Sequence, residues 1–214
     1  MPRKIDHEQR RQEIIRVTKD LIAERGLNGV SFREIGRRLG GSTTLATHYY
    51  ASLDDLYRDI AVAALERWQA DLRRIEKRYP DPAQRLNVIL FEWILPLTGK
   101  ELIDERARIN LVAAELQGQR TQEVLDMWEA GVKDVLRPAL RPFVPEERLE
   151  DYADALRAAF NGVALSTVEH PDHWSPRRQK VVFEALVEGL GLPIVPTKPR
   201  LTEPATPAAT RRGR

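Results

Sequence analysis

The segment Ser31–Tyr50, SFREIGRRLGGSTTLATHYY, predicts two short helices joined by a sharp turn. Ser31 and Glu34 have the spacing of a capping box, in which a hydroxyl and a carboxylate each bond an unpaired amide at a helix start. The apolar residues of this first helix share one face: Phe32, Ile35 and Leu39. Gly40 and Gly41 are expected to end it, because glycine tolerates the left-handed backbone found at helix ends.

Ser42 is placed to cap the second helix, which we predict to run to about Tyr49. Leu45, Tyr49 and Ala46 can pack inward, whereas the small polar residues can face outward: Thr43, Thr44, Thr47 and His48. Outward side chains of this kind suit base edges and phosphates. The pattern is typical of a helix-turn-helix, whose second helix lies in the DNA major groove. Two helices joined at a glycine turn also occur in proteins that never bind DNA.

The residues around this segment resemble the DNA-binding domain of the tetracycline-repressor (TetR) family of bacterial transcription regulators. The resemblance covers roughly the first quarter of the chain and includes Arg11, Ile14, Ile15, Leu21, Ile22, Arg25, Gly26, Ser31, Glu34, Ile35, Gly40, Ser42, His48, Tyr50, Asp54, Asp55 and Leu56. It implies an all-α fold, in which a three-helix DNA-binding domain precedes a helical domain for ligand binding and dimerisation.

Three positions depart from the family pattern. Family members usually carry Leu-Tyr where this chain has Ala46-Thr47, and a lysine where it has Leu53. In the family, that tyrosine and lysine contact phosphates or nearby bases. Thr47 keeps a hydroxyl, but Leu53 cannot neutralise a phosphate. The DNA-contacting residues that we predict are Arg33, Arg37, Ser42, Thr43, Thr44, Thr47, His48 and Tyr49.

Charge is divided unevenly along the 214 residues. Residues 1–50 hold ten Lys/Arg against six Asp/Glu and residues 198–214 hold five against one, so the remaining chain has a net charge of −6. A basic module joined to an acidic one is consistent with phosphate binding by the first, although solvated surface charge could produce the same balance by accident.

Composition also excludes several classes of site. Without cysteine, the chain has no disulfide, thiol nucleophile or zinc-finger site. No apolar run approaches the roughly 20 residues of a membrane span, and the N-terminus lacks the apolar core of a signal peptide. We therefore expect a cytoplasmic protein with no membrane partner.

The apolar periodicity predicts about nine helices and no strand. The helix after Ser52 is expected to extend to about Arg78, and the segment Leu86–Leu95 is apolar nearly all round, as in a buried helix. For the helix that follows Lys100 we predict an apolar face that includes Val112 and Ala113. The predicted domains are residues 1–52, which bind DNA, residues 53–192, which bind ligand and dimerise, and a disordered tail at 193–214.

The last two long helices carry a broad apolar surface with small residues that permit close packing. The resemblance implies that two copies form a four-helix dimer here, presenting two reading heads to a palindromic site. The dimer-interface residues that we predict are Leu156, Phe160, Val163, Val182, Phe183 and Leu186. The alternative is that this surface belongs to the core of the monomer.

The middle helices combine aromatic and polar residues, and the resemblance implies an inducer pocket there. Our predicted pocket residues are Trp93, Asn110, Trp128 and Asn161, which could instead be ordinary core residues. Aromatic residues with a carboxylate would suit an aromatic or a cationic ligand. The cluster His170–His173 lacks a third strong metal ligand, so we predict neither a metal nor a cofactor.

These observations together predict a DNA-binding regulator rather than an enzyme, because no catalytic motif is present. We expect a homodimeric repressor that binds a palindromic operator and is released by a small-molecule inducer. The alternative function is a helical ligand carrier or interaction module without a DNA role.

Overall fold

The computed structural model describes residues 7–41, 44–95, 100–116 and 122–195, and these contain nine α-helices and no strand. The predicted all-α fold is therefore confirmed. The helices are α1 (His7–Arg25), α2 (Phe32–Arg38), α3 (Thr44–Thr47), α4 (Leu53–Arg78), α5 (Pro82–Val88), α6 (Lys100–Leu116), α7 (Gln122–Leu140), α8 (Leu149–Glu169) and α9 (Pro176–Gly189). Two 3₁₀ turns, η1 (Leu27–Gly29) and η3 (Glu146–Arg148), and one π-helical turn, η2 (Ile89–Trp93), connect them.

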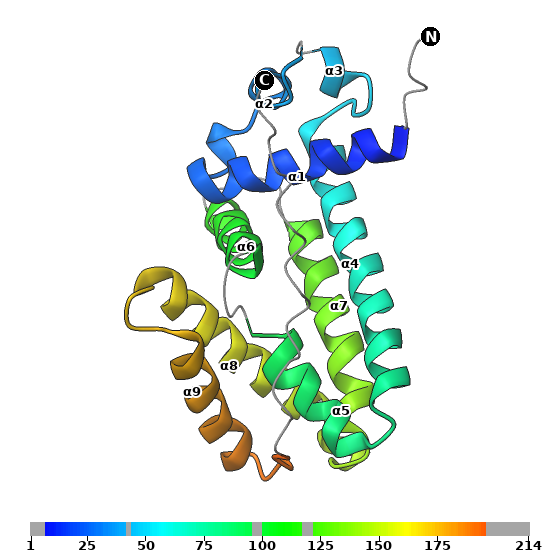
Figure 1. Ribbon diagram of the computed structural model, residues 1–214, viewed down its shortest axis with the longest axis vertical. Helices are drawn as coiled ribbons and strands as arrows, with labels where there is room; N and C mark the ends of the chain where they lie inside the picture. Colours follow the sequence, from blue (N-terminus) through cyan, green and yellow to red (C-terminus); the bar gives the residue numbers. More distant parts are fainter. Residues whose placement is uncertain (1–6, 42–43, 96–99, 117–121, 196–214) are drawn as a thin grey trace, which may run out of the picture.

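Helices α1, α2 and α3 form a head at one end of an elongated helical body (Figure 1). Helices α4 and α7 run side by side down the body, α8 packs on α7, and α9 packs on α8. Helix α6 lies directly beneath α1, where the two make an extensive contact. Within the described residues, no helix combines the length and apolar character needed to cross a membrane.

The turn between α2 and α3 closes as the glycines predict. Gly40 has a φ of +69°, the Gly40 N–H donates to the Arg37 carbonyl at 3.2 Å, and the Gly41 N–H donates to the Gly36 carbonyl at 2.9 Å. These two bonds form a Schellman motif, which satisfies carbonyls left open at the end of α2.

The caps at the starts of α4 and α2 differ in the structure. Ser52 and Asp55 form a complete capping box at the start of α4. The Ser31 hydroxyl accepts from the Glu34 N–H at 3.2 Å, but the Glu34 carboxylate bonds Arg25 and Arg37 instead of the Ser31 amide. The start of α2 was therefore predicted correctly, whereas its reciprocal bond was not.

Two hydrophobic cores stabilise the molecule. The larger lies among α5, η2, α7, α8 and α9, and Phe183 and Leu136 are fully buried in it. The smaller joins the head to the first turns of α4 and to parts of α6 and α7, through Leu56, Ile60 and Leu111. The core of the head therefore extends beyond residue 52.

Three predictions need correction. On α6 the buried face carries Ala107, Leu111 and Ala114, whereas Val112 and Ala113 are exposed. The apolar segment after α5 contains a π-helical turn, in which the Ile94 N–H donates to the Ile89 carbonyl at 2.9 Å. Residues 193–195 of the predicted tail are held by the buried Asn87 side chain, which bonds the Pro193 carbonyl at 2.8 Å and the Val195 N–H at 2.9 Å. The rest of that tail lies outside the described residues.

Candidate DNA interface and ligand cavity

Helix α3 presents polar side chains on the outside of the head. Thr44, Thr47 and His48 are exposed, and Ala46 is fully buried beneath them. The helix ends at Thr47 rather than at about Tyr49, although the His48 and Tyr50 N–H groups still donate to the Thr44 and Ala46 carbonyls, both at 3.1 Å. Ser42 and Thr43, which we predict to contact DNA, lie outside the described residues.

The end of α3 is braced by contacts that the sequence did not reveal. Tyr50 donates to the Asp59 carboxylate on α4 at 2.5 Å, and Arg11 on α1 donates to the same carboxylate at 2.8 Å. The Arg11 guanidinium also lies 5.8 Å from the centre of the Tyr50 ring. Burial, assisted by the Asp59 charge, raises the pKa of Tyr50 above its ordinary range. The half-buried Tyr49 is held at its hydroxyl by His7, at 3.1 Å.

The arginines of α2 are not equivalent. Arg37 bonds the Glu34 carboxylate through two nitrogens, at 2.9 and 2.6 Å, and Arg38 bonds Glu24. The bond from Arg37, assisted by nearby guanidiniums, lowers the pKa of Glu34 to about 2. Arg33 is exposed and has no carboxylate partner among the described residues. We predict that Arg33 and Arg37 on α2 contact phosphates. Of these two, only Arg33 forms no ion pair with a carboxylate in the described residues.

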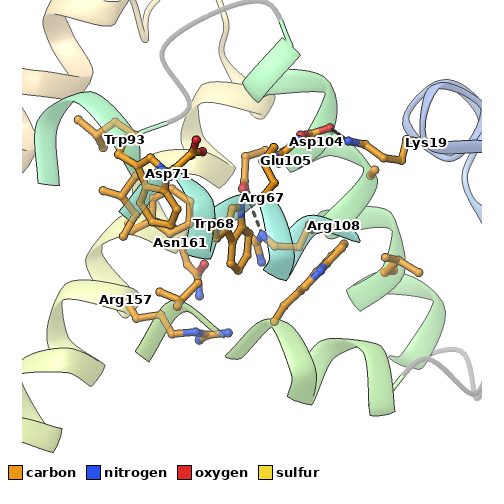
Figure 2. Close-up of a pocket in the computed structure, with 18 of the residues that line it drawn as sticks. Lys19, Arg67, Trp68, Asp71, Trp93, Asp104, Glu105, Arg108, Arg157 and Asn161 are labelled. Atoms are coloured by element: carbon orange, nitrogen blue, oxygen red, sulfur yellow. Dashed lines mark hydrogen bonds and ion pairs between the residues drawn. The ribbon is translucent and has the colours of Figure 1, made fainter. Parts of the chain in front are cut away.

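A cavity of about 560 Å³ lies in the body beneath the head. Its aromatic wall comes from several elements: Trp68 on α4, Trp93 on η2, Trp128 on α7 and Phe160 on α8. Asn161 on α8 lines it as well, and Figure 2 shows the amide turned toward the middle of the cavity. The structure therefore brings together three of the four predicted pocket residues.

Asn110 was assigned to the pocket incorrectly. Its amide nitrogen donates to the Arg106 carbonyl at 2.9 Å, and its oxygen lies 3.3 Å from the position that a Cβ on Gly26 would occupy. Asn110 therefore faces the end of α1 rather than the cavity. The residues of α6 that line the cavity include Asp104, Glu105 and Arg108.

Charged side chains line the cavity together with the aromatic residues (Figure 2). Asp104 on α6 pairs with Lys19 on α1 and, at 3.3 Å, with Arg67 on α4. This carboxylate therefore joins the head to two helices of the body. Sequence periodicity could not reveal the arrangement, because charged residues buried as pairs have the same spacing as residues that face solvent.

The remaining charged groups of the cavity form pairs of their own. Glu105 accepts from Arg108 at 2.8 Å, and burial raises the pKa of Glu105 even though Arg108 opposes the shift. The other pairs each join a cavity residue to a residue outside it: Asp71 with Arg74, Glu92 with Lys180, and Arg157 with Glu129.

The Trp128 indole and the Asn161 amide are neutral polar groups of the cavity that lack partners among the described residues. The Trp128 indole nitrogen is buried without an acceptor. The Asn161 side chain makes no hydrogen bond to another described residue. The Trp93 indole nitrogen, in contrast, donates to Asp71 at 3.3 Å.

Most of the predicted dimer-interface residues lie inside the chain itself. Four of the six are buried in the larger core: Leu156, Phe160, Val163 and Phe183. Their assignment to the interface was wrong, because they are already covered within one copy. Val182 is half-buried, and Leu186 is 42% exposed. The outer surface of α8 and α9 also carries the exposed residues Leu165 and Val181.

The histidine cluster has the form of a turn after α8. The His173 and Trp174 N–H groups both donate to the His170 carbonyl at 3.0 Å. Across the described part of the chain, no group of three or more His, Asp or Glu side chains is arranged to hold a metal ion.

Comparison with known proteins agrees with this architecture. Residues 14–60 match the family profile described as bacterial regulatory proteins, tetR family. The HTH-type transcriptional regulator PksA of Bacillus subtilis (strain 168) is 27% identical over 196 residues, which cover 89% of this chain and 94% of PksA.

Solved structures share the fold at lower sequence identity. A transcriptional regulator from Rhodococcus sp. Rha1 is 21% identical with a TM-score of 0.73, over 87% of this chain and 99% of the other. A regulator from Saccharomonospora viridis, solved in complex with choline, is 18% identical with a TM-score of 0.68, over 85% and 97%. Over residues 14–60 the chain thus matches the tetR family of bacterial regulatory proteins, and over most of its length it shares the fold of solved transcriptional regulators.

Proposed function

We propose that this regulator is a homodimeric repressor that binds a palindromic operator and is released when a small-molecule inducer enters the cavity. Each head would place α3 in a major groove, with Thr44, Thr47 and His48 toward the bases and Arg33 on a phosphate. The exposure of these side chains supports this assignment. So does the buried layer of Ala46 and Tyr50, which holds α3 against the head.

The observation that carries the proposal is the reach of the cavity. Its wall includes Lys19 and Ile22 on α1, so a ligand would touch the head as well as the body. Asp104 connects Lys19 to Arg67 across the same wall. An inducer must bind one conformation of the protein more tightly than another. A ligand that binds more tightly when α1 is displaced would lower the population of conformations that bind DNA.

The π-helical turn supports a binding role for the cavity. It carries Glu92 and Trp93, and both residues line the cavity. Single π-helical turns within helices are rare and are often found at functional sites, because the added residue turns side chains that a regular helix would direct elsewhere. The choline bound to the Saccharomonospora viridis regulator shows that a protein of this fold can bind a small molecule.

The proposed function can be tested with DNA from upstream of the protein's own gene. We expect tight, sequence-selective binding that weakens steeply with salt, measured by fluorescence anisotropy across a salt series. The double variant Thr47→Ala/His48→Ala should lose selectivity while it keeps part of the salt-dependent, non-specific binding. The variant Arg141→Ala, altered in the body after α7, serves as the control.

Two results would contradict the proposal. Binding that is weak, unselective and unchanged in the double variant would place the target of this head elsewhere. A DNA affinity that stays constant when compounds fill the cavity would remove the inducer from the proposal and leave the DNA-binding role intact.

A further inference from the structure

The chemistry of the cavity wall restricts the class of ligand. The inference rests on the proposed function, because it takes the 560 Å³ cavity to be the ligand site. Pockets of this size bind drug-sized molecules, and a few polar groups usually fix their orientation. An indole-lined wall suits any flat aromatic ring, and it attracts organic cations as well. The polar groups therefore decide between these classes.

Each charged side chain that lines the cavity already has a partner of opposite charge. On α6, Asp104 holds Lys19 and Arg67, and Glu105 holds Arg108. The other three lining charges are paired with residues outside the wall: Asp71 with Arg74, Glu92 with Lys180, and Arg157 with Glu129. The lining comprises four acidic and four basic side chains, so its net charge is zero.

A charged ligand would have to disturb these pairs. An ion that leaves water loses its hydration, and it regains most of that free energy only when it is paired with an opposite charge and hydrogen-bonded. A cation would compete with arginine or lysine for a carboxylate that is already bonded. An anion near Glu105 would meet surroundings in which burial already disfavours negative charge, since it raises the pKa of that carboxyl.

Two neutral polar groups, in contrast, have no hydrogen-bond partner among the described residues. The Trp128 indole N–H is buried in the wall and has no acceptor among the described residues. The Asn161 amide can both donate and accept, and it has no partner in the described part of the chain. An unpaired buried donor is costly, so a ligand oxygen placed against the indole would be strongly favoured.

We propose that the ligand is an uncharged aromatic molecule bearing carbonyl or hydroxyl oxygens, whose rings pack among Trp68, Trp93 and Trp128. One oxygen accepts from the Trp128 N–H, and another polar atom bonds the Asn161 amide. The paired charges around the rings stay in place. The ligand is thus recognised by its shape and its oxygen atoms rather than by a net charge.

Four naphthalene probes of matched shape test this assignment: naphthalene itself, and the same ring carrying an acetyl, a carboxylate or a methylammonium group. Equilibrium dialysis against the full-length protein measures each affinity. We expect the acetyl compound to bind at least about 10-fold more tightly than either ion, since an ion must give up its hydration. The dialysis is repeated with Trp128→Phe, which keeps an aromatic ring but removes the N–H group.

The Trp128→Phe variant removes some ring packing for both compounds. It should weaken the acetyl compound roughly 3- to 10-fold more than it weakens naphthalene, which corresponds to one net hydrogen bond. The control is Trp174→Phe, the same substitution outside the cavity, which should change neither affinity. Circular dichroism checks that both variants retain their helices.

Each contrary result has a distinct meaning. Tighter binding of the ammonium or the carboxylate compound would contradict the proposal that the ligand is uncharged, but it would still support the cavity as a ligand site. Equal losses for the acetyl compound and naphthalene in Trp128→Phe, or no loss for either, would overturn the assigned hydrogen bond. If none of the four probes binds, the cavity is not a ligand site, and the inducer part of the proposed function fails with the inference.

Discussion

For the single residues of the head, ion pairing decides which cations are available to DNA. Arg33 is exposed and has no carboxylate partner among the described residues, whereas Arg38 is bonded to Glu24. We expect Arg33→Ala to weaken operator binding more than Arg38→Ala does. It should also reduce the slope of log K against log salt by about 0.9, the value for one released phosphate contact. Anisotropy titrations at several salt concentrations measure both quantities, and equal slopes in the two variants would contradict the assignment.

Glu34 gives the head a dependence on pH. Its pKa falls from an ordinary 4.5 to about 2, mainly because Arg37 bonds the carboxylate. A lowered folded-state pKa means that the ionised group stabilises the fold above about pH 4.5, and that this contribution is lost as the pH falls toward 2. We expect Glu34→Gln to lower Tm slightly at neutral pH, because the arginines that pair with Glu34 are exposed and solvent screens these ion pairs.

The Tm difference between wild type and Glu34→Gln should shrink as the pH is lowered below about 4.5. Thermal unfolding followed by circular dichroism measures it. The control, Glu66→Gln, alters an exposed residue of α4 that has no ion pair in the described part of the chain. A Glu34→Gln difference that is constant with pH, or that grows in acid, would show that the charge of Glu34 does not stabilise the head.

Among the secondary-structure elements, α4 and α7 depend on a glycine for their close approach. A Cβ on Gly131 would lie 2.1 Å from Cδ2 of Leu65 and 3.2 Å from the Trp68 ring. We expect Gly131→Ala to destabilise the protein by about 1 kcal/mol. Overpacking costs about 1 to 3 kcal/mol, and alanine returns nearly 1 kcal/mol through its helix propensity.

Urea denaturation of Gly131→Ala measures this cost, and Gly162→Ala on α8 is the matched control. A Cβ on Gly162 would meet no atom within 4 Å, so only the helix-propensity gain should remain, up to about 1 kcal/mol of added stability. If both alanines stabilise the protein equally, the contact between α4 and α7 is looser than the structure shows.

The elements also show what the sequence could predict. The starts of α4 and α9 could be predicted because they depend on a local hydrogen bond: the Ser52 and Ser175 hydroxyls each accept from an amide in the first turn of their own helix. The π-helical turn could not be predicted because Leu86–Leu95 is apolar on every side. Such a segment has the same apolar pattern whether its hydrogen bonds are α-helical or π-helical. On α6, the predicted face was wrong because Asp104, Glu105 and Arg108 resemble a solvent-facing stripe but line a cavity.

Site residues whose position depends on one short segment could be predicted from the sequence, whereas contacts between separate helices could not. Thr44, Thr47 and His48 are exposed because the period of a short helix turns them away from Ala46, and that period is readable from the sequence. The support for Tyr50 comes from Arg11 and Asp59, which lie on two other helices, and no local pattern joins them. The Asp104 pairs, likewise, exist only once α1, α4 and α6 have packed together.

Across the whole molecule, Asp104 is the residue best placed to transmit occupancy of the cavity to the head. We expect Asp104→Asn to bind the acetyl naphthalene probe within about 3-fold of wild type, because neither aromatic packing nor the Trp128 N–H changes. The effect of the probe on DNA affinity should shrink, since the ionic link between Lys19 and Arg67 is weakened. Anisotropy titrations with and without the probe measure this coupling. If the probe changes the DNA affinity of Asp104→Asn as much as that of wild type, the ionic link through Asp104 does not transmit the effect.

The proposed function requires two copies of the chain to associate, and we propose that they do so through the outside of α8 and α9. It carries Leu165 at 43%, Val181 at 49% and Leu186 at 42% exposure, around the small residues Ala155 and Ala158. The residues beneath them are committed to the core of the monomer. A dimer would therefore use the outer stripe of these helices.

Leu186→Asp is expected to break that dimer, because a carboxylate buried against an apolar partner surface has no compensating charge. Sedimentation velocity should show a dimer for wild type and a monomer for the variant at the same concentration. Operator affinity should fall at least about 100-fold, since each head would then bind without the effective concentration that the second provides. Val62→Asp places the same charge on another exposed apolar residue, 37% exposed on α4, and should leave both properties unchanged. A wild-type monomer, or equal losses in the two variants, would rule out this surface as the dimer interface.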